Sequence, residues 1–405
     1  MCIKQWIVYI GKKIRNGKYE YMNSSSGRKK RIDMAYTLAK QSLYACAQDT
    51  GFVAGGHHFV DLWARDSLFA TFGANSAGYG DISKKTIQTF LSYQREDGLV
   101  PYLILRSKHT IGKYFQRHTY YTKPVAVFRS HMSFGTVPDG GAMTVIAMRM
   151  YVEKTHDTSF LIKHYASLVR VITWYTNRYG GRLVHEWFQC EWADALLKSG
   201  NTLYTNVLYF RAVKDMAWLS TQLNKAPESV RYELLAKQIQ RNINDTLWNG
   251  LYFSDWHDWR RRDYFASHPN MLAIIFGLAT KEQAASILFF AKKRAWNGWT
   301  LVNSVPEYPI WRVSLLHILL GLREYHNGFI WLQPGIVYAI ALYVSGRRGD
   351  ARNILSGIGK KIVEWDGAHE VYERDSTPVR RRMYTAEHPF AWSAGHFVWA
   401  WDMMR

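Results

Sequence analysis

Apolar residues recur at intervals of three and four along most of this chain, which is the spacing of one face of an α-helix. The pattern predicts helices of roughly ten to twenty residues rather than strands. They cover residues 33–48, 83–94, 141–155, 159–179, 202–223, 230–248, 281–293, 335–347 and 350–365.

The segments between these helices are irregular and rich in Gly, Pro, Trp and acidic residues, and no fixed repeat period relates them. About one such loop follows each pair of helices, which favours paired helices arranged around a common axis with their loops on one face. We therefore predict an all-α fold, with a basic and partly disordered leader over residues 1–31 and one domain over residues 32–405.

Composition adds a large aromatic content and a strong positive charge. Aromatic residues make up 15% of the 405 residues, enough to line a pocket for a sugar or a base as well as a core. The formal net charge of +20 attracts anions in general. Its basic runs at 28–31, 260–262 and 380–382 match no nucleic-acid-binding motif, so we interpret them mainly as solvated surface.

Several classes of chemistry find no support in the sequence. The three cysteines lack metal-ligand spacing, as do His57, His58 and His131, so no metal or other cofactor is expected. No GxSxG or phosphate-binding loop occurs. The cysteine usage and the lack of a long apolar run predict a soluble cytoplasmic protein without a membrane span.

Carboxylates in aromatic, Gly-rich loops are the remaining candidates. Glycoside hydrolysis uses two of them, one protonated and one ionised, and burial in such loops can keep a proton on one of them near neutral pH. Three loops qualify: FVDLWARDS with Asp66, CEWADALLKSG with Glu191 and Asp194, and GAHEVYERDS with Glu370 and Glu373. Each also has a structural reading, as a helix N-cap, a helix-start acid or a solvated turn.

Taken in order, these loops resemble a clan of (α/α)6-barrel exo-glycosidases. The clan includes neutral invertases, trehalases, glucoamylases and the amylo-α-1,6-glucosidase domain of glycogen debranching enzymes. WARDS (63–67) is similar to its opening element, EWADA (191–195) to its general-acid segment, and HEVYE (369–373) to its general-base segment. YHNGFIW (325–331), SHPNMLAIIFGLATKEQAASIL (267–288) and EHPFAWSAGHFVWA (387–400) resemble further elements in the same order.

The resemblance implies an (α/α)6 toroid, a six-hairpin glycosidase barrel, with Asp194 as general acid and Glu370 as general base. Glu373 occupies a position usually filled by Asp or Asn, and Glu191 replaces a residue that is usually neutral. The implied sugar-binding residues are Trp63, Arg65, Asp66, Glu191, Trp192, His326, Asn327, Trp331, Tyr372, Glu387 and Trp392.

The function that follows is an inverting, exo-acting glycoside hydrolase, foremost an α-glucosidase of the amylo-α-1,6-glucosidase type acting on glucan or oligosaccharide ends. A neutral-invertase-like sucrose hydrolase is the alternative within the class. Two alternatives belong to other classes: a carbohydrate-binding protein without turnover, and a basic helical protein that binds nucleic acid or an anionic surface. The expected partner is an oligosaccharide or disaccharide substrate, with no specific nucleic acid, and the sequence does not fix the oligomeric state.

Overall fold

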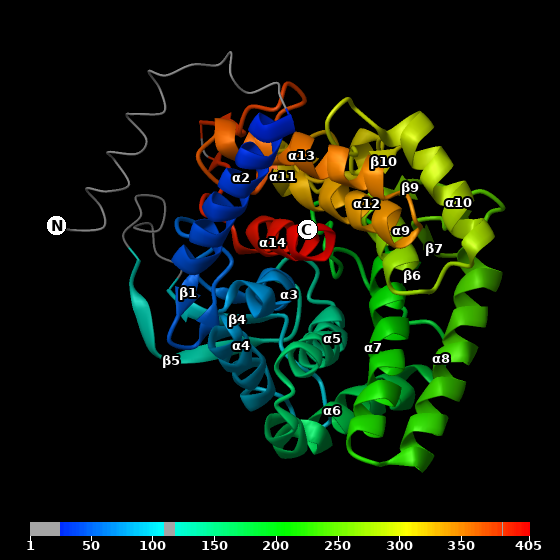
Figure 1. Cartoon of the computed structure of the whole chain (residues 1–405). Helices are drawn as coiled ribbons and strands as arrows, with labels where there is room; N and C mark the ends of the chain where they lie inside the picture. Colours follow the sequence, from blue (N-terminus) through cyan, green and yellow to red (C-terminus); the bar gives the residue numbers. More distant parts are fainter. Residues whose placement is uncertain (1–24, 109–117, 383) are drawn as a thin grey trace.

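A computed structural model describes residues 25–108, 118–382 and 384–405, and in these residues six helices form a closed inner ring. Each inner helix packs against the next, and the last returns to the first (Figure 1). In ring order they are α3 (Ala64–Ala77), α5 (Asp139–Thr155), α7 (Leu203–Gln222), α9 (Ser267–Ile275), α12 (Leu332–Val344) and α14 (Ala391–Met404).

An outer layer of helices covers the ring, each packed against inner neighbours. It consists of α2 (Ser25–Ala45), α4 (Gly80–Ser92), α6 (Thr158–Tyr179), α8 (Ala226–Leu247), α10 (Lys281–Phe290) and α13 (Arg348–Glu364). The predicted all-α, (α/α)6 architecture is thereby confirmed. Most of the predicted basic leader lies outside the described residues, and α2 begins within it, at Ser25.

The two layers differ in how much of each helix is buried. In α12 every residue from Leu332 to Leu342 is buried, whereas α8 buries one stripe at Tyr232, Ala236, Ile239, Ile243 and Leu247. A helix that is apolar all round belongs inside a core, and a helix with one apolar stripe belongs at its surface. The hydrophobic core is thus concentrated on the inner ring.

Two inner helices, α3 and α14, approach each other closely where they cross. A Cβ atom on Gly73 would lie 2.1 Å from the carbonyl oxygen of Gly395, so only glycine fits at this point. The start of α3 is thereby held close to α14, and both helices contribute to the site described below.

Short strands precede or flank the starts of the inner helices and shape the loops. β3 (Leu62–Trp63) pairs with β4 (Leu103–Ser107), which pairs with β5 (Tyr120–Val127). β11 (Ile330–Trp331) pairs with β12 (Val371–Tyr372), and β13 (Arg380–Arg381) with β14 (Tyr384–Thr385), all antiparallel. The remaining ladders join β1 (Ala47–Gln48) to β2 (Gly51–Phe52), β6 (Asn201–Thr202) to β7 (Trp256–His257) and β8 (Arg261–Arg262), and β9 (Phe265–Ala266) to β10 (Ser304–Val305).

Three short helical segments lie outside the two layers. They are the π-helical η3 (Ala291–Ala295), the 3₁₀-helical η4 (Ile310–Arg312) and α11 (Leu315–Leu319). No helix in the described ranges combines the length and the apolar character that crossing a membrane requires.

Candidate active site

A cavity of about 210 Å³ opens where the inner helices begin. It lies against the first turns of α3 and α14 and the residue that precedes α12. Of the residues predicted from the sequence, it is lined by Trp63, Arg65, Asp66, Trp192, Asp194, His326, Trp331, Glu370 and Trp392. The fold therefore brings the three candidate carboxylate loops to one place.

Asp194 lies in an irregular turn between α6 and α7 that is fixed through its backbone. Gln189 donates from its side chain to the Asp194 carbonyl oxygen at 3.2 Å, and the amide of Ala195 donates to Nδ1 of His326 at 3.2 Å. The carboxyl group itself is half-buried and faces the cavity. Burial raises the pKa of Asp194 to about 6, although the nearby Arg65 lowers it.

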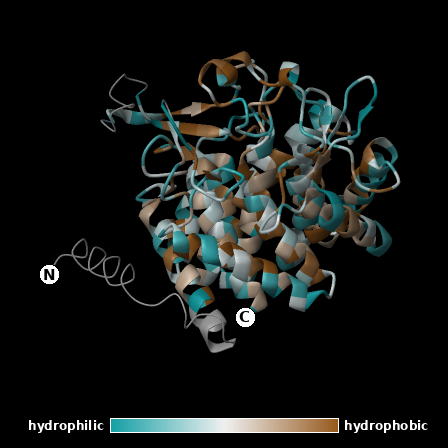
Figure 2. Cartoon of the chain, turned by 90° about the horizontal axis from the view of Figure 1, so that it is seen from above, coloured by the Kyte–Doolittle hydropathy of each residue, from teal (hydrophilic) through white to brown (hydrophobic). Residues whose placement is uncertain are grey.

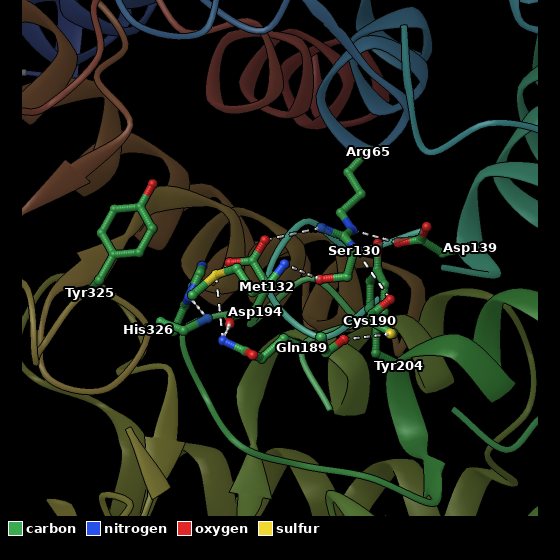
Figure 3. A network of polar contacts seen from close by, with 12 residues as sticks. Arg65, Ser130, Met132, Asp139, Gln189, Cys190, Asp194, Tyr204, Tyr325 and His326 are labelled. Atoms are coloured by element: carbon green, nitrogen blue, oxygen red, sulfur yellow. Dashed lines mark hydrogen bonds and ion pairs between the residues drawn. The ribbon is translucent and has the colours of Figure 1, made fainter. Parts of the chain in front are cut away.

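Arg65 connects this turn to the helical ring (Figure 3). Its Nε donates to the carboxylate of Asp139, the first residue of α5, and its Nη2 donates to the carbonyl oxygen of Cys190 at 3.2 Å. Its Nη1 lies 3.6 Å from the Asp194 carboxylate. The guanidinium group is thus oriented by two fixed acceptors, and it limits how far burial raises the pKa of Asp194.

His326 approaches the same carboxylate without forming an ion pair. Its Nδ1 is 3.8 Å from Asp194 Oδ1, but that nitrogen accepts the Ala195 hydrogen bond and so carries no proton. Burial holds the pKa of His326 well below its usual value, in agreement with a neutral ring. The ring stacks on Trp331, with centroids 5.0 Å apart.

Glu370 reaches the cavity through the β11–β12 ladder, in which Trp331 faces Val371. Its carboxylate is buried and accepts hydrogen bonds from the hydroxyl of Tyr325, the hydroxyl of Tyr384 at 2.5 Å and the amide of Glu387 at 3.1 Å. Burial raises the pKa of Glu370 to about 7, while the two tyrosine hydroxyls lower it. Two phenol donors therefore stabilise the ionised form of a buried carboxylate.

Asp66 is the third carboxyl group on the cavity. It lies in the first turn of α3, where Trp63 occupies the N-cap position, so it is not the helix cap that the sequence also allowed. Burial, and then the charge of Glu370, raise the pKa of Asp66 to about 8, against the effect of Arg65. Carboxyl groups that share one pocket cannot all ionise freely, so the cavity holds protons near neutral pH.

Aromatic rings form the walls of the cavity. Trp192 meets Trp331 and Trp392 nearly edge to face, with ring centroids 5.8 and 6.0 Å apart. Phe59 and Phe390 add further apolar surface. Carboxylates set among aromatic faces suit a sugar ring, which has both hydroxyl groups and apolar C–H faces.

Four predicted site residues do not line the cavity. Glu191 turns to Lys198, which also contacts Asp255 at 3.0 Å, and Glu387 accepts from the amide of His58 at 2.7 Å behind Glu370. Asn327 holds the backbone of Tyr308 through two hydrogen bonds, and Tyr372 is buried against Trp299. These side chains support the loops of the site.

Other residues on or beside the cavity were missed by sequence reasoning. Tyr325 begins the YHNGFIW segment, so a signal was present, but its hydrogen bond to Glu370 depends on the fold. Phe59 and Phe390 likewise lie in the quoted segments FVDLWARDS and EHPFAWSAGHFVWA, although neither was singled out. Met132, His317 and Tyr384 lie outside all the quoted segments and carried no local signal. Across the described ranges, no three His, Cys, Asp or Glu side chains are grouped to hold a metal ion.

A closed ring of inner helices, each paired with an outer helix, defines the six-hairpin fold. The family model of the bacterial alpha-L-rhamnosidase 6 hairpin glycosidase domain matches residues 63–301, more than half of the chain. The chain belongs to this family. The predicted membership of the six-hairpin glycosidase clan is thereby confirmed.

Solved structures with the same fold are distant in sequence. The GH63 mannosylglycerate hydrolase from Thermus thermophilus superposes with a TM-score of 0.68 at 14% identity, covering 91% of this chain and 100% of that chain. A rhamnosidase from Klebsiella oxytoca with rhamnose bound gives 0.66 at 16% identity, over 95% of this chain and 65% of that one. The GH78 rhamnosidase of Bacillus sp. GL1 gives 0.62 at 16% identity, over 91% and 34%. No curated protein matches the sequence.

Proposed function

We propose that this protein is an inverting, exo-acting glycoside hydrolase that removes one terminal, α-linked monosaccharide. The observation that carries the proposal is that Asp194 and Glu370, from loops 176 residues apart in the chain, line one small aromatic cavity. Membership of a glycosidase family supports the same reading.

The dimensions of the cavity support attack on chain ends. Its volume of about 210 Å³ is below the range of roughly 300–1,000 Å³ of pockets that enclose drug-sized ligands. One sugar ring therefore occupies the cavity, and the rest of the substrate remains outside.

Asp194 acts in this mechanism as the general acid and donates its proton to the glycosidic oxygen. Glu370 acts as the general base and removes a proton from a water molecule, whose oxygen attacks the anomeric carbon from the opposite face. The bond to the leaving group breaks as the new C–O bond forms, so the anomeric configuration inverts. This requires carboxyl groups roughly 6.5–9.5 Å apart.

Burial and hydrogen bonding bear on the role of each carboxyl group, and they place the pKa of Glu370, about 7, above that of Asp194, about 6. Burial keeps the proton on Asp194 to a higher pH than in an ordinary aspartate, which suits an acid. The hydroxyl groups of Tyr325 and Tyr384 stabilise the anionic form of Glu370, which suits a base. Asp66 lines the same cavity and is placed to accept hydrogen bonds from sugar hydroxyls.

The family match and the apolar walls favour an α-L-rhamnoside as substrate, because the methyl group of this 6-deoxy sugar packs well on aromatic rings. The sequence motifs favour instead an α-glucoside of the amylo-α-1,6-glucosidase type, or sucrose. Both classes are α-linked and use the same two carboxylates, so only the identity of the terminal sugar differs.

The test is an NMR time course of the anomeric protons released from aryl α-L-rhamnoside, aryl α-D-glucoside, mannosylglycerate, sucrose, maltose and isomaltose. Wild type is compared with Asp194→Asn, Glu370→Gln and, as a matched control, the exposed Glu96→Gln. We expect the β-anomer first, with a loss of about 10²-fold to 10⁴-fold in both site variants and none in the control.

Early release of the α-anomer contradicts inversion. Sugar binding without turnover of any substrate favours the non-catalytic carbohydrate-binding protein. Equal activity in the Asp194 variant and the control removes Asp194 from the mechanism.

A further inference from the structure

The mouth of the sugar cavity carries an unusually apolar surface, formed by η4 and α11. Leu315 and Leu319 are exposed to 68% and 75%, and Trp311 to 74%. Leu316 is also exposed, whereas the neighbouring His317 turns inward and lines the cavity. A short helix therefore presents its leucines to solvent and its histidine to the site.

This apolar face lies on the side of the molecule that holds the loops. In Figure 2 short strands and loops gather along the upper edge of the molecule. On another side of the cavity, Phe134 is 76% exposed two residues from the cavity-lining Met132. Phe134 also has a φ of 59°, a left-handed conformation that bulky residues rarely adopt.

A basic hairpin lies beside the apolar face. The ring of His317 stacks on Tyr325 at 5.8 Å, and Tyr325 meets Tyr384 of β14 at 5.6 Å. Tyr384 pairs in register with Arg381 of β13, whose guanidinium lies over the ring of Phe329 at 5.0 Å. The hairpin formed by β13 and β14 is thus connected to α11 through a continuous set of ring contacts.

The arginines of this hairpin are exposed and only partly neutralised. Arg381 is paired with Glu373, and the neighbouring Arg374 with Glu307. Arg380 and Arg382 form no ion pair with any described residue. The exposed apolar side chains and the exposed arginines therefore come from two elements, α11 and the β13–β14 hairpin, that both reach the cavity: His317 lines it and Tyr384 bonds to Glu370.

We propose that this face, consisting of η4, α11 and the β13–β14 hairpin, docks on an anionic lipid surface. Leucines and an indole enter the boundary between headgroups and acyl chains, while exposed arginines contact lipid phosphates. Exposed leucines alone would suit a protein partner. The arginines of the hairpin and the net charge of +20 favour an anionic membrane instead, because their charge is complementary to it. Peripheral docking needs no membrane-spanning helix.

Docking would turn the sugar cavity toward the membrane. If the proposed hydrolase activity holds, the terminal sugars reached in this orientation belong to glycans displayed at a lipid surface. This consequence rests on the proposed function, whereas the docking itself does not.

The test is co-sedimentation of the full chain with vesicles of phosphatidylcholine alone or of phosphatidylcholine mixed with phosphatidylglycerol. We expect binding to the mixed vesicles only. The double substitution Leu315→Glu and Leu319→Glu is expected to lower the partition coefficient by about tenfold or more, because it removes apolar area and adds charge repulsion. Arg380→Gln with Arg382→Gln should lower it by about thirtyfold, at roughly 1 kcal/mol per basic residue.

The matched control is Leu234→Glu, which changes a leucine that is 61% exposed on α8, in the outer layer. Equal loss in the control and the α11 variant overturns the proposal, since it reduces binding to general charge attraction. Absence of binding to either vesicle also overturns it. So does a dimer in solution that the α11 substitutions abolish, because the face is then a protein interface. Thermal unfolding of each variant checks that the fold is intact, and none of these readouts depends on glycosidase activity.

Discussion

At the scale of single residues, the site depends on which of its carboxyl groups holds a proton. The pKa of Asp194 is about 6 and that of Glu370 about 7, so the form with a protonated Asp194 and an ionised Glu370 is the minor singly protonated form. Because the two pKa values are one unit apart, about a tenth of the molecules that hold one proton on this pair carry it on Asp194. The kcat/KM profile should therefore be a narrow bell with its maximum between pH 6 and 7.

Replacing Tyr384 by Phe tests the assignment of the alkaline limb of this profile. The Tyr384 hydroxyl lowers the pKa of Glu370, so its removal raises that pKa. We expect the alkaline limb to move up by less than about one pH unit, and the maximal rate to fall by roughly threefold to tenfold because the reactive form becomes rarer. The kcat/KM of Tyr384→Phe between pH 4 and 9 measures both.

Tyr121→Phe is the matched control, because Tyr121 is an exposed tyrosine on β5. A Tyr384→Phe profile that superposes on wild type would show that Glu370 is not the group that titrates in the alkaline limb.

The raised pKa of Asp66 predicts that the free energy of unfolding depends on pH. Its pKa is raised from 3.8 to about 8 in the folded protein, so the unfolded chain ionises first as the pH rises. Between pH 3.8 and about pH 8 the folded protein binds more protons than the unfolded chain, so the free energy of unfolding falls as the pH rises. Asp66→Asn removes this dependence, so the variant should gain about 1–3 kcal/mol relative to wild type at pH 8 and little at pH 4.

Urea unfolding of both proteins at the two pH values measures the gain. Hydrolysis should be weakened in the same variant because a carboxyl group of the cavity is lost. A difference in stability that is the same at pH 4 and pH 8 would contradict the raised pKa of Asp66.

At the scale of elements, the crossing of α3 and α14 controls the shape of the cavity. Gly395→Ala would place a Cβ atom 2.6 Å from the Cα of Ala70, so the two helices must separate. We expect a loss of about 1–3 kcal/mol in the free energy of unfolding, as for other overpacked cores. Activity should fall too, because α3 carries Arg65 and Asp66 and α14 carries Trp392.

Gly357→Ala is the matched control, since Gly357 lies within α13 with no atom within 4 Å of the added Cβ. There alanine should stabilise the helix by about 0.5–1 kcal/mol. Denaturant unfolding of both variants separates the cost of the steric clash at Gly395 from the gain in backbone entropy that alanine brings to any helix. Stabilisation by both substitutions would contradict a tight crossing.

The same two layers explain what the sequence could predict. Every outer helix was predicted, because a helix with one buried stripe repeats its apolar residues every three or four positions. The pattern did not mark α3, whose buried residues include Arg65, Ser67, Thr71 and Asn75, or α9, which is buried nearly throughout. Periodicity weakens when all faces are buried, so α3 and α9 could be approached only through motifs, whereas the inner helices α5, α7 and α12 were still predicted from their apolar residues.

The cavity shows the same limit. Motifs pointed to Asp194 and Glu370 as candidates, but short β-ladders and loop contacts decide which neighbours reach the cavity. Glu191 and Asp194 are three residues apart in a segment that is a turn rather than a helix, so they point to different partners: Lys198 for one and the cavity for the other. Local spacing could not reveal this division.

At the scale of the whole molecule, salt should separate the long-range effect of the net charge of +20 from the reaction in the cavity. Hydrolysis of a small neutral glycoside involves no long-range attraction, so kcat/KM should change by less than about twofold between about 50 and 500 mM NaCl. Association with phosphatidylglycerol-containing vesicles should fall by about tenfold or more over the same range, since the Debye length shortens from roughly 14 to 4 Å.

A steep salt dependence of both processes would mean that the charge acts at the cavity itself and would favour a charged substrate over a neutral one. Vesicle association that does not respond to salt would mean that α11 alone determines docking.

The β13–β14 hairpin links the proposed lipid contact to Glu370, because it carries Arg380 and Arg382 as well as Tyr384, whose hydroxyl bonds to Glu370. Binding of the arginines to lipid can therefore change the pKa of Glu370. We therefore expect anionic vesicles to shift the alkaline limb of hydrolysis in wild type but not in the variant with both arginines replaced by glutamine.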